Sequence, residues 1–454
     1  MQAESRKGVK VIVGLGQTGL SCARYFHSRG ETFRVMDSRF SPPGLAAFQS
    51  EFPLVDIELG GFRPESLMQA SEIVLSPGIS LKTPEIAAAV AAGVPVTGDI
   101  DIFSRQVKAP VVAITGSNGK STVVTLVGEM AVKAGLSVGV GGNLDGHAST
   151  PALDLLSIGN RDLYVLELSS FQLETTQSLN AEVAAILNIS EDHLDRYDTM
   201  QDYAAAKQRI FNGCRQFVVN LDDPASTPWN PQGQPTYSFS LSAAPAEGRA
   251  GIALKDGQKW IFIGEQPVIA LRDIRLVGRH NVANAMAACL LGRAAGLPME
   301  AMVATLKEFA GLPHRCQLVA RHHDVEYYND SKGTNVGATV VALEGIGERI
   351  NGEIILIAGG VGKEQDFSPL LPAIDRFVKR VILIGKDADK IAKVIGQRVD
   401  IMRASSMEEA VQEASLSAAP GDAVVLSPAC ASFDMFKDFA HRGRVFAAAA
   451  EALS

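Results

Sequence analysis

A loop of glycine, lysine and hydroxyl residues is the segment of this sequence best suited to chemistry. Residues Thr115–Thr122 read TGSNGKST, with an apolar run before them and a helical pattern after them. Backbone amides in such a loop wrap phosphates, Lys120 can reach the β- and γ-phosphate oxygens, and the hydroxyl of Ser121 or Thr122 can hold Mg²⁺. The full P-loop spacing requires a glycine where Ile114 stands. The sequence therefore predicts a variant P-loop, for which ATP is a better ligand than a dinucleotide.

An earlier glycine loop has the pattern of a dinucleotide fingerprint. Gly14, Gly16 and Gly19 follow the apolar run Val9–Val13, and Asp37 closes the next run. Glycines in this context let the backbone approach a pyrophosphate, and the helix N-terminus supplies amide donors and the positive end of a dipole. Any nucleotide diphosphate would satisfy these donors, so the motif predicts a nucleotide site without specifying NAD. The alternative is a tight turn in an empty Rossmann-like domain.

Three further polar residues follow the second loop. Glu167 ends an apolar run, where open α/β sheets present functional groups, and is either a metal ligand or a carboxylate exposed to water. His193 lies among acidic residues and is either functional or a loop histidine bonded to its neighbours. Lys207 falls in an alanine-rich helical pattern, which by composition predicts an ordinary surface lysine.

The last third of the chain holds two more loops of interest. Gly359, Gly360, Gly362 and Lys363 follow an apolar run and would suit a carboxylate or phosphate, although Lys363 could equally be a solvated loop lysine. Farther on, Ser432 is placed to cap a helix. Phe433, Phe436 and Ala440 would then form one helical stripe packed into the core.

The elements that must position these residues alternate between short β-branched runs and helical stretches, which predicts an α/β protein with parallel sheets covered by helices. The expected strands are Val9–Val13, Phe33–Asp37, Val111–Ile114, Tyr164–Leu168, Val183–Asn188, Phe217–Asn220, Val325–Asn329, Glu353–Ala358, Val381–Ile384 and Ala423–Leu426. Between Pro224 and Leu276, hairpins around Asp256-Gly257 predict an antiparallel insertion, and Asn281–Phe309 reads as one long helical stretch.

The length of 454 residues suggests about three domains at ~150 residues each. Turn-rich segments at residues 92–98 and 310–313 mark the boundaries. We therefore expect a Rossmann-like domain at 1–98, a central P-loop domain at 99–311 and a second Rossmann-like domain at 312–454.

Composition excludes several other classes of protein. With 50 acidic and 42 basic residues the net charge is −8, which argues against a dedicated nucleic-acid binder. The five cysteines have neither zinc nor disulfide spacing. A signal peptide and an apolar run of about 18 residues are both absent from the sequence. We expect a reduced, cytoplasmic protein without a transmembrane segment.

Several motifs in order resemble the Mur ligase family of bacterial cell-wall synthesis, to which folylpolyglutamate synthase is related. The resemblance covers about residues 9–446 and is carried by Thr115–Thr122, Leu166–Leu173, Asn188–Tyr197, Gly278–Ala285, Pro313–Arg315 and Asn329–Asn335. The first glycine loop, Ser76–Gly78 and the segment Leu426–Gly443 are similar to the subfamily that adds D-glutamate.

The resemblance implies a three-domain ATP-dependent ligase that joins an acid to a D-amino acid in peptidoglycan precursor synthesis. The implied substrates are ATP, UDP-N-acetylmuramoyl-L-alanine and D-glutamate, and the implied intermediate is an acyl phosphate. Two Mg²⁺ sites, a carbamylated lysine and a monomeric state are also expected. Substrates held by three domains imply domain closure before chemistry.

The resemblance also implies roles for individual residues. Lys120, Glu167, His193 and Lys207 would be catalytic, and the Mg²⁺ ligands would be Ser121, Thr122, Glu167, His193 and carbamylated Lys207. The implied ATP site comprises Gly116, Ser117, Asn118, Gly119, Lys120, Ser121, Thr122, Asn281, Arg315 and Asp330. The implied site for the UDP substrate comprises Thr18, Asp37, Ser38, Arg39, Gly78 and Asn143. The implied site for D-glutamate comprises Lys332, Thr334, Lys363, Ser432, Phe433 and Phe439.

Other functions remain open at this point. Another Mur-type or folylpolyglutamate ligase would share most of the motifs. An NAD(P)-dependent oxidoreductase would explain the first glycine loop but leave the second without a role. A non-catalytic nucleotide-gated module is possible if Lys120 serves affinity alone.

Overall fold

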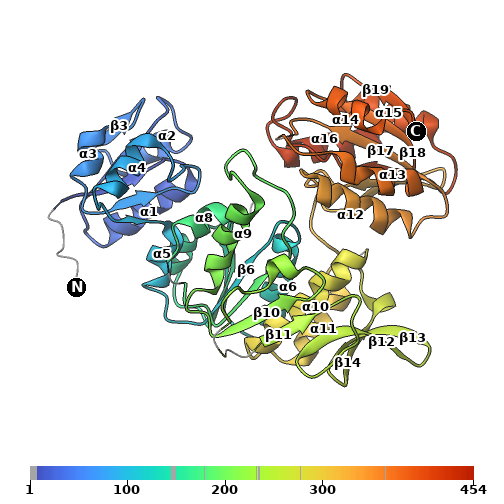
Figure 1. Cartoon of the computed structure of the whole chain (residues 1–454), viewed down its shortest axis with the longest axis horizontal. Helices are drawn as coiled ribbons and strands as arrows, with labels where there is room; N and C mark the ends of the chain where they lie inside the picture. The colour runs from blue at the N-terminus through green and yellow to red at the C-terminus, as the bar shows by residue number, and fades with distance from the viewer. Residues whose placement is uncertain are drawn as a thin grey trace.

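The chain forms three α/β lobes, each built on its own sheet (Figure 1). The computed structural model describes residues 8–144, 150–177, 179–231, 233, 236–276, 278–362 and 364–453. The amino-terminal and carboxy-terminal lobes lie on either side of the middle lobe in Figure 1. The three-domain α/β architecture predicted from the sequence is confirmed.

The amino-terminal sheet is wholly parallel, in the order β3-β2-β1-β4-β5. The strand order reverses at β1 and β4, and open α/β sheets bind ligands beyond the carboxyl ends of strands at such a point. The elements are β1 (Lys10–Val13), α1 (Gln17–Ser28), β2 (Phe33–Asp37), α2 (Leu45–Glu51), β3 (Ile57–Leu59), α3 (Pro64–Met68), β4 (Ile73–Leu75), α4 (Pro84–Ala91) and β5 (Val96–Thr97), followed by α5 (Asp99–Ser104).

The middle sheet has the order β14-β13-β12-β11-β10-β9-β6-β8-β7. The strands β6 and β8 are buried along their whole length, as expected for parallel strands covered on both faces. The elements are β6 (Val111–Thr115), α6 (Lys120–Lys133), β7 (Val138–Gly142), α7 (Ala152–Ser157), β8 (Leu163–Glu167), α8 (Ser170–Glu174), β9 (Val183–Ile186), α9 (Met200–Gln208), η1 (Arg209–Phe211), β10 (Gln216–Asn220), η2 (Pro224–Ser226), β11 (Thr236–Phe239), β12 (Arg249–Lys255), β13 (Gln258–Ile263), β14 (Gln266–Ala270), η3 (Leu271–Asp273), α10 (Arg279–Ala294) and α11 (Met299–Glu308).

The carboxy-terminal sheet has the order β15-β16-β20-β17-β18-β19, and only the edge strand β15 is antiparallel to its neighbour. The elements are β15 (Gln317–His322), β16 (Val325–Asn329), α12 (Val336–Gly347), β17 (Ile354–Gly359), η4 (Ser368–Leu370), α13 (Leu371–Phe377), β18 (Val378–Ile384), α14 (Ala388–Ile395), β19 (Asp400–Arg403), α15 (Met407–Ser417), β20 (Ala423–Leu426) and α16 (Phe439–Glu451).

The first two lobes share part of their apolar core. One cluster of buried side chains joins residues of β1 and α1, such as Ile12 and Phe26, to residues of β6 and β8, such as Ala113 and Leu166. The Ser21 hydroxyl also donates a hydrogen bond to Asp154 Oδ1 at 2.6 Å across this junction. The two lobes therefore pack as one body around a common core.

Two expectations about the middle lobe are wrong in part. The hairpin around Asp256-Gly257 exists, but β11 and β12 are each paired in parallel, so only β12–β14 are antiparallel and they extend the main sheet. The stretch expected as one helix is two, α10 and α11, because Gly296 takes a positive φ of 80° and Pro298 follows it.

The expected helix start at Ser432 is also wrong. Helix α16 begins at Phe439, where the Asp438 side chain accepts a hydrogen bond from the backbone N–H of His441 and caps the helix. Ser432 is buried in the preceding turn, and its carbonyl accepts from the backbone N–H of Phe436. The predicted apolar stripe fails with it, since the Phe433 side chain is 75% exposed.

Candidate functional site

The variant P-loop joins β6 to α6 in a shape that requires its glycines. Gly119 precedes α6 with a φ of 84°, and a Cβ there would lie 2.5 Å from Asn284 Oδ1. Asn188 holds the loop from outside, because its carbonyl and its side-chain oxygen accept the backbone N–H groups of Ser117 and Asn118. The Lys120 ammonium donates to the carbonyls of Gly116 and Ser117 at 2.9 and 3.0 Å.

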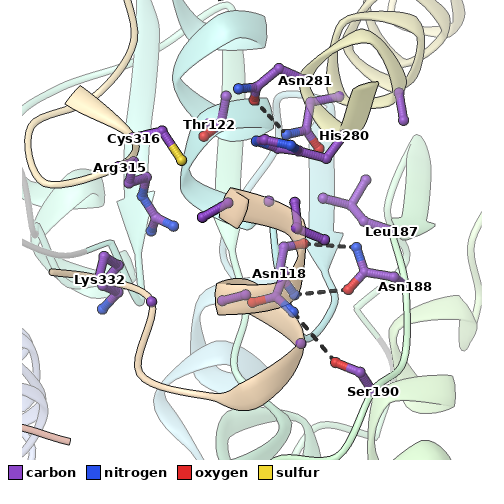
Figure 2. Close-up of a pocket in the computed structure, with 18 of the residues that line it drawn as sticks. Asn118, Thr122, Leu187, Asn188, Ser190, His280, Asn281, Arg315, Cys316 and Lys332 are labelled. Atoms are coloured by element: carbon purple, nitrogen blue, oxygen red, sulfur yellow. Dashed lines mark hydrogen bonds between the residues drawn. The ribbon is translucent and has the colours of Figure 1, made fainter. Parts of the chain in front are cut away.

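A cavity of about 400 Å³ opens beside this loop, between the middle and carboxy-terminal lobes (Figure 2). Six of the ten residues predicted for ATP line it: Asn118, Gly119, Thr122, Asn281, Arg315 and Asp330. Arg315 also donates from Nη2 to Ser121 Oγ at 2.8 Å, so that a carboxy-terminal residue reaches the first turn of α6. The other four do not line the cavity: Gly116 and Ser117 lie in the loop, and Lys120 and Ser121 begin α6.

The cavity also contains residues that sequence reasoning missed. Asn188, His280 and Asn284 line it, and burial lowers the pKa of His280 to about 4, so this imidazole is neutral at pH 7. Asp330 is buried, which raises the pKa of its carboxyl to about 6 although Ser427 Oγ donates to it at 2.7 Å. His280 and Asn284 belong to the motif Gly278–Ala285, and the polar periodicity of that motif was the signal that could have found them.

The expectation of a surface lysine at position 207 is wrong. Lys207 is 2% exposed, and its Nζ donates to the Gly116 carbonyl at 3.0 Å and to Thr115 Oγ1 at 3.3 Å. Burial, assisted by the positive charge of Lys120, holds the pKa of the Lys207 amine well below its ordinary value. The amine therefore lies directly beneath the P-loop and has an increased neutral fraction.

Glu167 is the last residue of β8, and His193 lies in the segment between β9 and α9. The negative charges of Glu167 and of Asp192, the neighbour of His193, both act on Lys207. Glu167 is buried, and its Oε2 has no hydrogen-bond partner among the residues that the structure describes. His193 has a φ of 57°, with its ring packed edge-on against Phe171 at 4.7 Å and its Nε2 3.6 Å from Asp192 Oδ2. Within the described ranges, His, Cys, Asp and Glu side chains alone form no group of three or more able to hold a metal ion. Any metal here would need ligands from outside that set.

A second cavity, of about 620 Å³, lies at the switch point of the amino-terminal sheet and reaches the middle lobe. Five of the six residues predicted for the UDP substrate line it: Thr18, Ser38, Arg39, Gly78 and Asn143. Ser76, Asp99 and Gln172 also line it and were not predicted.

The sixth predicted residue, Asp37, lies beneath this cavity and is fully buried. Its carboxylate accepts the backbone N–H of Leu15 at 2.7 Å and two side-chain N–H groups of Arg39 at 2.8 and 2.9 Å. Burial alone would raise the pKa of Asp37, but these hydrogen bonds outweigh it and the pKa is lowered. Asp37 thus fixes the first glycine loop and orients Arg39.

The residues predicted for D-glutamate come from several separate segments of the sequence in the carboxy-terminal third of the chain. Lys332 lines the first cavity, and its Nζ lies 4.0 Å from the centre of the Phe439 ring. Thr334 is half-buried two residues on, Ser432 is buried and Phe433 is exposed. Lys363 lies outside the described residues. Among these residues, the structure therefore brings Lys332 and Phe439 together.

A buried arginine that the sequence reasoning missed supports the Lys332 loop. Arg442 is 1% exposed and donates to the hydroxyl and carbonyl oxygens of Ser331 and to the Cys430 carbonyl. These contacts link α16 to the loops after β16 and β20. No local pattern marks this arginine, because all of its partners come from distant segments.

Taken together, the fold and the cavities define a three-domain P-loop protein with one cavity beside the P-loop and another at a Rossmann-like switch point. Family models agree over most of the chain: Mur ligase MurD-like, N-terminal domain (residues 8–98), Mur ligase middle domain (114–292) and Mur ligase, glutamate ligase domain (314–430). The chain belongs to the Mur ligase family.

Individual relatives give the same result. The chain is 51% identical over 445 residues to UDP-N-acetylmuramoylalanine–D-glutamate ligase of Pseudomonas aeruginosa, with 98% of each chain covered. Among solved structures, UDP-N-acetylmuramate-alanine ligase of Thermotoga maritima is similar with a TM-score of 0.60 at 17% identity, covering 98% of this chain and 99% of that one. FolC of E. coli in complex with DHPP and ADP has a TM-score of 0.59 at 18% identity, covering 77% and 92%. No helix among the described residues is long and apolar enough to cross a membrane.

Proposed function

We propose that this protein joins D-glutamate to UDP-N-acetylmuramoyl-L-alanine at the expense of ATP, in peptidoglycan precursor synthesis. The observation that carries this proposal is the full-length similarity to ligases of that name, at 51% identity in the Pseudomonas aeruginosa relative. The cavities support it, because a nucleotide-linked substrate and ATP require separate sites, and one cavity lies beside the P-loop while another lies at the switch point of the amino-terminal sheet.

The chemistry that this reaction demands fits the residues near the P-loop. A carboxylate is a poor acylating agent, so the alanyl carboxylate first attacks the γ-phosphate of ATP and releases ADP. The D-glutamate amine then attacks the acyl phosphate carbon, and phosphate leaves as the amide forms. Lys120 offsets the negative charge that accumulates when carboxylate and triphosphate meet, and positioning accounts for much of the remaining acceleration.

ATP and Mg²⁺ are the nucleotide and metal expected for this family, and the chain offers groups that fit a hard cation. The buried Glu167 Oε2 has no hydrogen-bond partner among the described residues, and the hydroxyl of Thr122 lines the cavity. Both are oxygen ligands of the kind Mg²⁺ prefers. The Ser121 hydroxyl accepts from Arg315, which leaves its other lone pair for a ligand. Bound Mg²⁺ would neutralise phosphate charge, and we assign a second ion to His193 and carbamylated Lys207.

Carbamylation of Lys207 is supported by its burial and lowered pKa. A neutral amine adds to the carbon of CO₂ to give an N-carboxylate and releases one proton. This converts a buried group that repels Mg²⁺ into an anion that attracts it. The nearby positive charge of Lys120 favours the anionic product for the same reason that it disfavours the ammonium.

We assign the second cavity to the UDP substrate, the first to ATP, and Lys332, Thr334, Lys363, Ser432, Phe433 and Phe439 to D-glutamate.

We further propose domain boundaries near residues 98 and 311, a monomeric cytoplasmic protein, and rotation of the carboxy-terminal lobe onto the P-loop when ATP and the UDP substrate bind. Small-angle scattering should show compaction only with both ligands, and an unchanged profile would contradict the rotation.

Phosphate release tests the proposed function. The purified protein is given ATP, Mg²⁺ and UDP-N-acetylmuramoyl-L-alanine with D-glutamate, L-glutamate, D-alanine or no amino acid. Release that depends on D-glutamate supports the proposal, and its absence contradicts it. Release with a folate and L-glutamate would identify a folylpolyglutamate ligase, and NAD(P)H oxidation would identify an oxidoreductase.

A further inference from the structure

One arginine links the turn that carries His193 to the amino-terminal lobe. Arg196 lies three residues after His193, and its side chain is 12% exposed. It donates from Nη1 to the Pro77 carbonyl at 2.8 Å and from Nη2 to the Ile79 carbonyl at 3.2 Å. Both carbonyls belong to the loop after β4, where Ser76, Pro77, Gly78 and Ile79 line the second cavity. The middle lobe therefore holds the backbone of this cavity-lining loop through a single side chain.

The same guanidinium makes a two-pronged ion pair inside the middle lobe. Its Nε and Nη2 donate to the two carboxylate oxygens of Glu174 at 3.1 and 2.6 Å, and it stacks over the Phe171 ring at 4.2 Å. Glu174 is the last residue of α8, where a carboxylate opposes the helix dipole. The positive charge of Arg196 offsets this unfavourable interaction between the Glu174 carboxylate and the helix dipole.

Two contacts connect Arg196 to the position of His193. The backbone N–H of Arg196 donates to the His193 carbonyl at 3.0 Å, which closes the turn that His193 begins in a left-handed conformation. Phe171, under the guanidinium, packs against the His193 ring at 4.7 Å. A shift of Arg196 would therefore move the His193 backbone and the aromatic ring that supports its imidazole.

We propose that Arg196 is a positioning residue that couples occupation of the second cavity to the placement of His193, so that the UDP substrate and Mg²⁺-nucleotide each strengthen binding of the other. This inference rests on the proposed function for the identity of the two ligands. The physical basis is the cost of an unpaired buried charge: the loop 76–79 cannot leave its place without stripping hydrogen bonds from a guanidinium that water barely reaches. Fixing this loop with substrate thus fixes the His193 turn.

The experiment measures binding rather than turnover. Dissociation constants for UDP-N-acetylmuramoyl-L-alanine and for a non-hydrolysable ATP analogue with Mg²⁺ are determined separately and then each in the presence of the other. We expect at least about fivefold tightening in the wild-type protein, the lower end of ordinary allosteric coupling. In Arg196→Lys, the tightening of each ligand's binding by the other should fall below about twofold, because one ammonium cannot make the several hydrogen bonds of the planar guanidinium. Affinity for each ligand alone should change by less than about threefold.

A matched control is available on the same junction. Lys82 Nζ pairs with Asp198 Oδ2 at 2.5 Å, which also ties the amino-terminal lobe to the His193 segment, but the two side chains are 64% and 79% exposed. Lys82→Met should retain the wild-type coupling, because an exposed ion pair contributes little. Arg196→Gln should behave as Arg196→Lys does, and if Arg196→Gln fails to fold then Arg196→Lys decides.

The outcomes separate this inference from the proposed function. Wild-type protein that binds both ligands without coupling overturns the inference alone, as does a folded Arg196→Lys protein that keeps at least fivefold coupling. Equal loss of coupling in Lys82→Met and Arg196→Lys also overturns it, because any contact at the junction would then suffice. Failure of the wild-type protein to bind the UDP substrate contradicts the proposed function itself.

Discussion

The two glycine loops begin alike and end in different surroundings. Each follows a buried parallel strand and leads into a helix, and each lies beside a cavity. The first loop is held by one carboxylate, Asp37, with Arg39 at the cavity wall. Around the second loop lie the basic side chains of Lys120, Lys207 and Arg315 and the carboxylate of Glu167. A strand–loop–helix unit supplies a place for phosphate, and the additional charges supply the means to transfer it.

The sharpest test of this difference is the P-loop lysine. Lys120→Met should lower kcat by about 10²–10³-fold, because a charge aimed at the transferring phosphoryl group is lost. Initial-rate kinetics of D-glutamate-dependent phosphate release measure this change in kcat. Thr18→Val in the first loop is the comparison, and it should raise KM for the UDP substrate while kcat is kept. Equal effects on kcat would remove the distinction between the loops.

Substitution of Lys207 tests whether its buried amine is converted to an anionic carbamate. Lys207→Arg keeps a cation where a carbamate is proposed and should lower activity by about 10–100-fold, the range for groups that order a metal site. Removal of CO₂ from the buffer should lower wild-type activity, and bicarbonate should restore it. An NMR signal from ¹³C-bicarbonate attached to the wild-type protein, absent in Lys207→Arg, would identify the adduct. Wild-type activity indifferent to CO₂ would contradict carbamylation.

Arg39 tests the binding role of the first cavity. Arg39→Ala should raise KM for the UDP substrate by about three- to tenfold with little change in kcat, because a half-exposed charged donor contributes modestly. Titration calorimetry with the UDP substrate should show the same factor. A change in kcat larger than the change in KM would mean that the first loop also takes part in the reaction.

The smallest expected effect is on the pH dependence of stability, where the two regions should oppose each other. The lowered pKa of Asp37 gives stability that is present above its ordinary pKa and lost as pH falls through the lowered value. The pKa of Asp330 is raised to about 6, so its contribution is present at low pH and lost as pH rises through about 6. Relative to wild type, Asp330→Asn should gain about 2–4 °C in Tm as the pH rises from 4 to 8. Asp37→Asn should have a lower Tm than wild type throughout that range, and this deficit should shrink only as the pH falls below the ordinary pKa of the carboxyl. Calorimetry checks both, and shifts of the same sign would contradict the assignments.

Sequence patterns predicted several buried strands well because β-branched, aromatic and other apolar residues predominate in them. Phe33–Asp37, Val325–Asn329 and Ala423–Leu426 match their observed bounds. The short strand β5 and the glycine-rich β7 were missed. A strand of two residues is too short to show an alternation of apolar and polar side chains, and glycines in a strand have no side chain to show it. Local pattern therefore predicts the centre of a sheet better than its edges.

Site residues that are buried by segments distant in the sequence were harder to predict from local sequence patterns. Lys207 lies in an alanine-rich helix that resembles a surface helix, yet its Nζ contacts Thr115 and Gly116 across the lobe. Arg196 finds its carbonyl partners more than a hundred residues earlier in the chain. Only the motif resemblance pointed to Lys207, and nothing in the sequence alone pointed to Arg196.

The contact between Arg315 and Ser121 joins residues 194 positions apart and has a consequence for the order of events during synthesis. Domains fold largely as units while the chain emerges from the ribosome. The core shared by the first two lobes is complete once β10 has emerged, so the second cavity can form early. The wall of the nucleotide cavity needs α12, more than a hundred residues later. On the proposed function, a nascent chain would thus bind the sugar nucleotide well before its ATP site is complete.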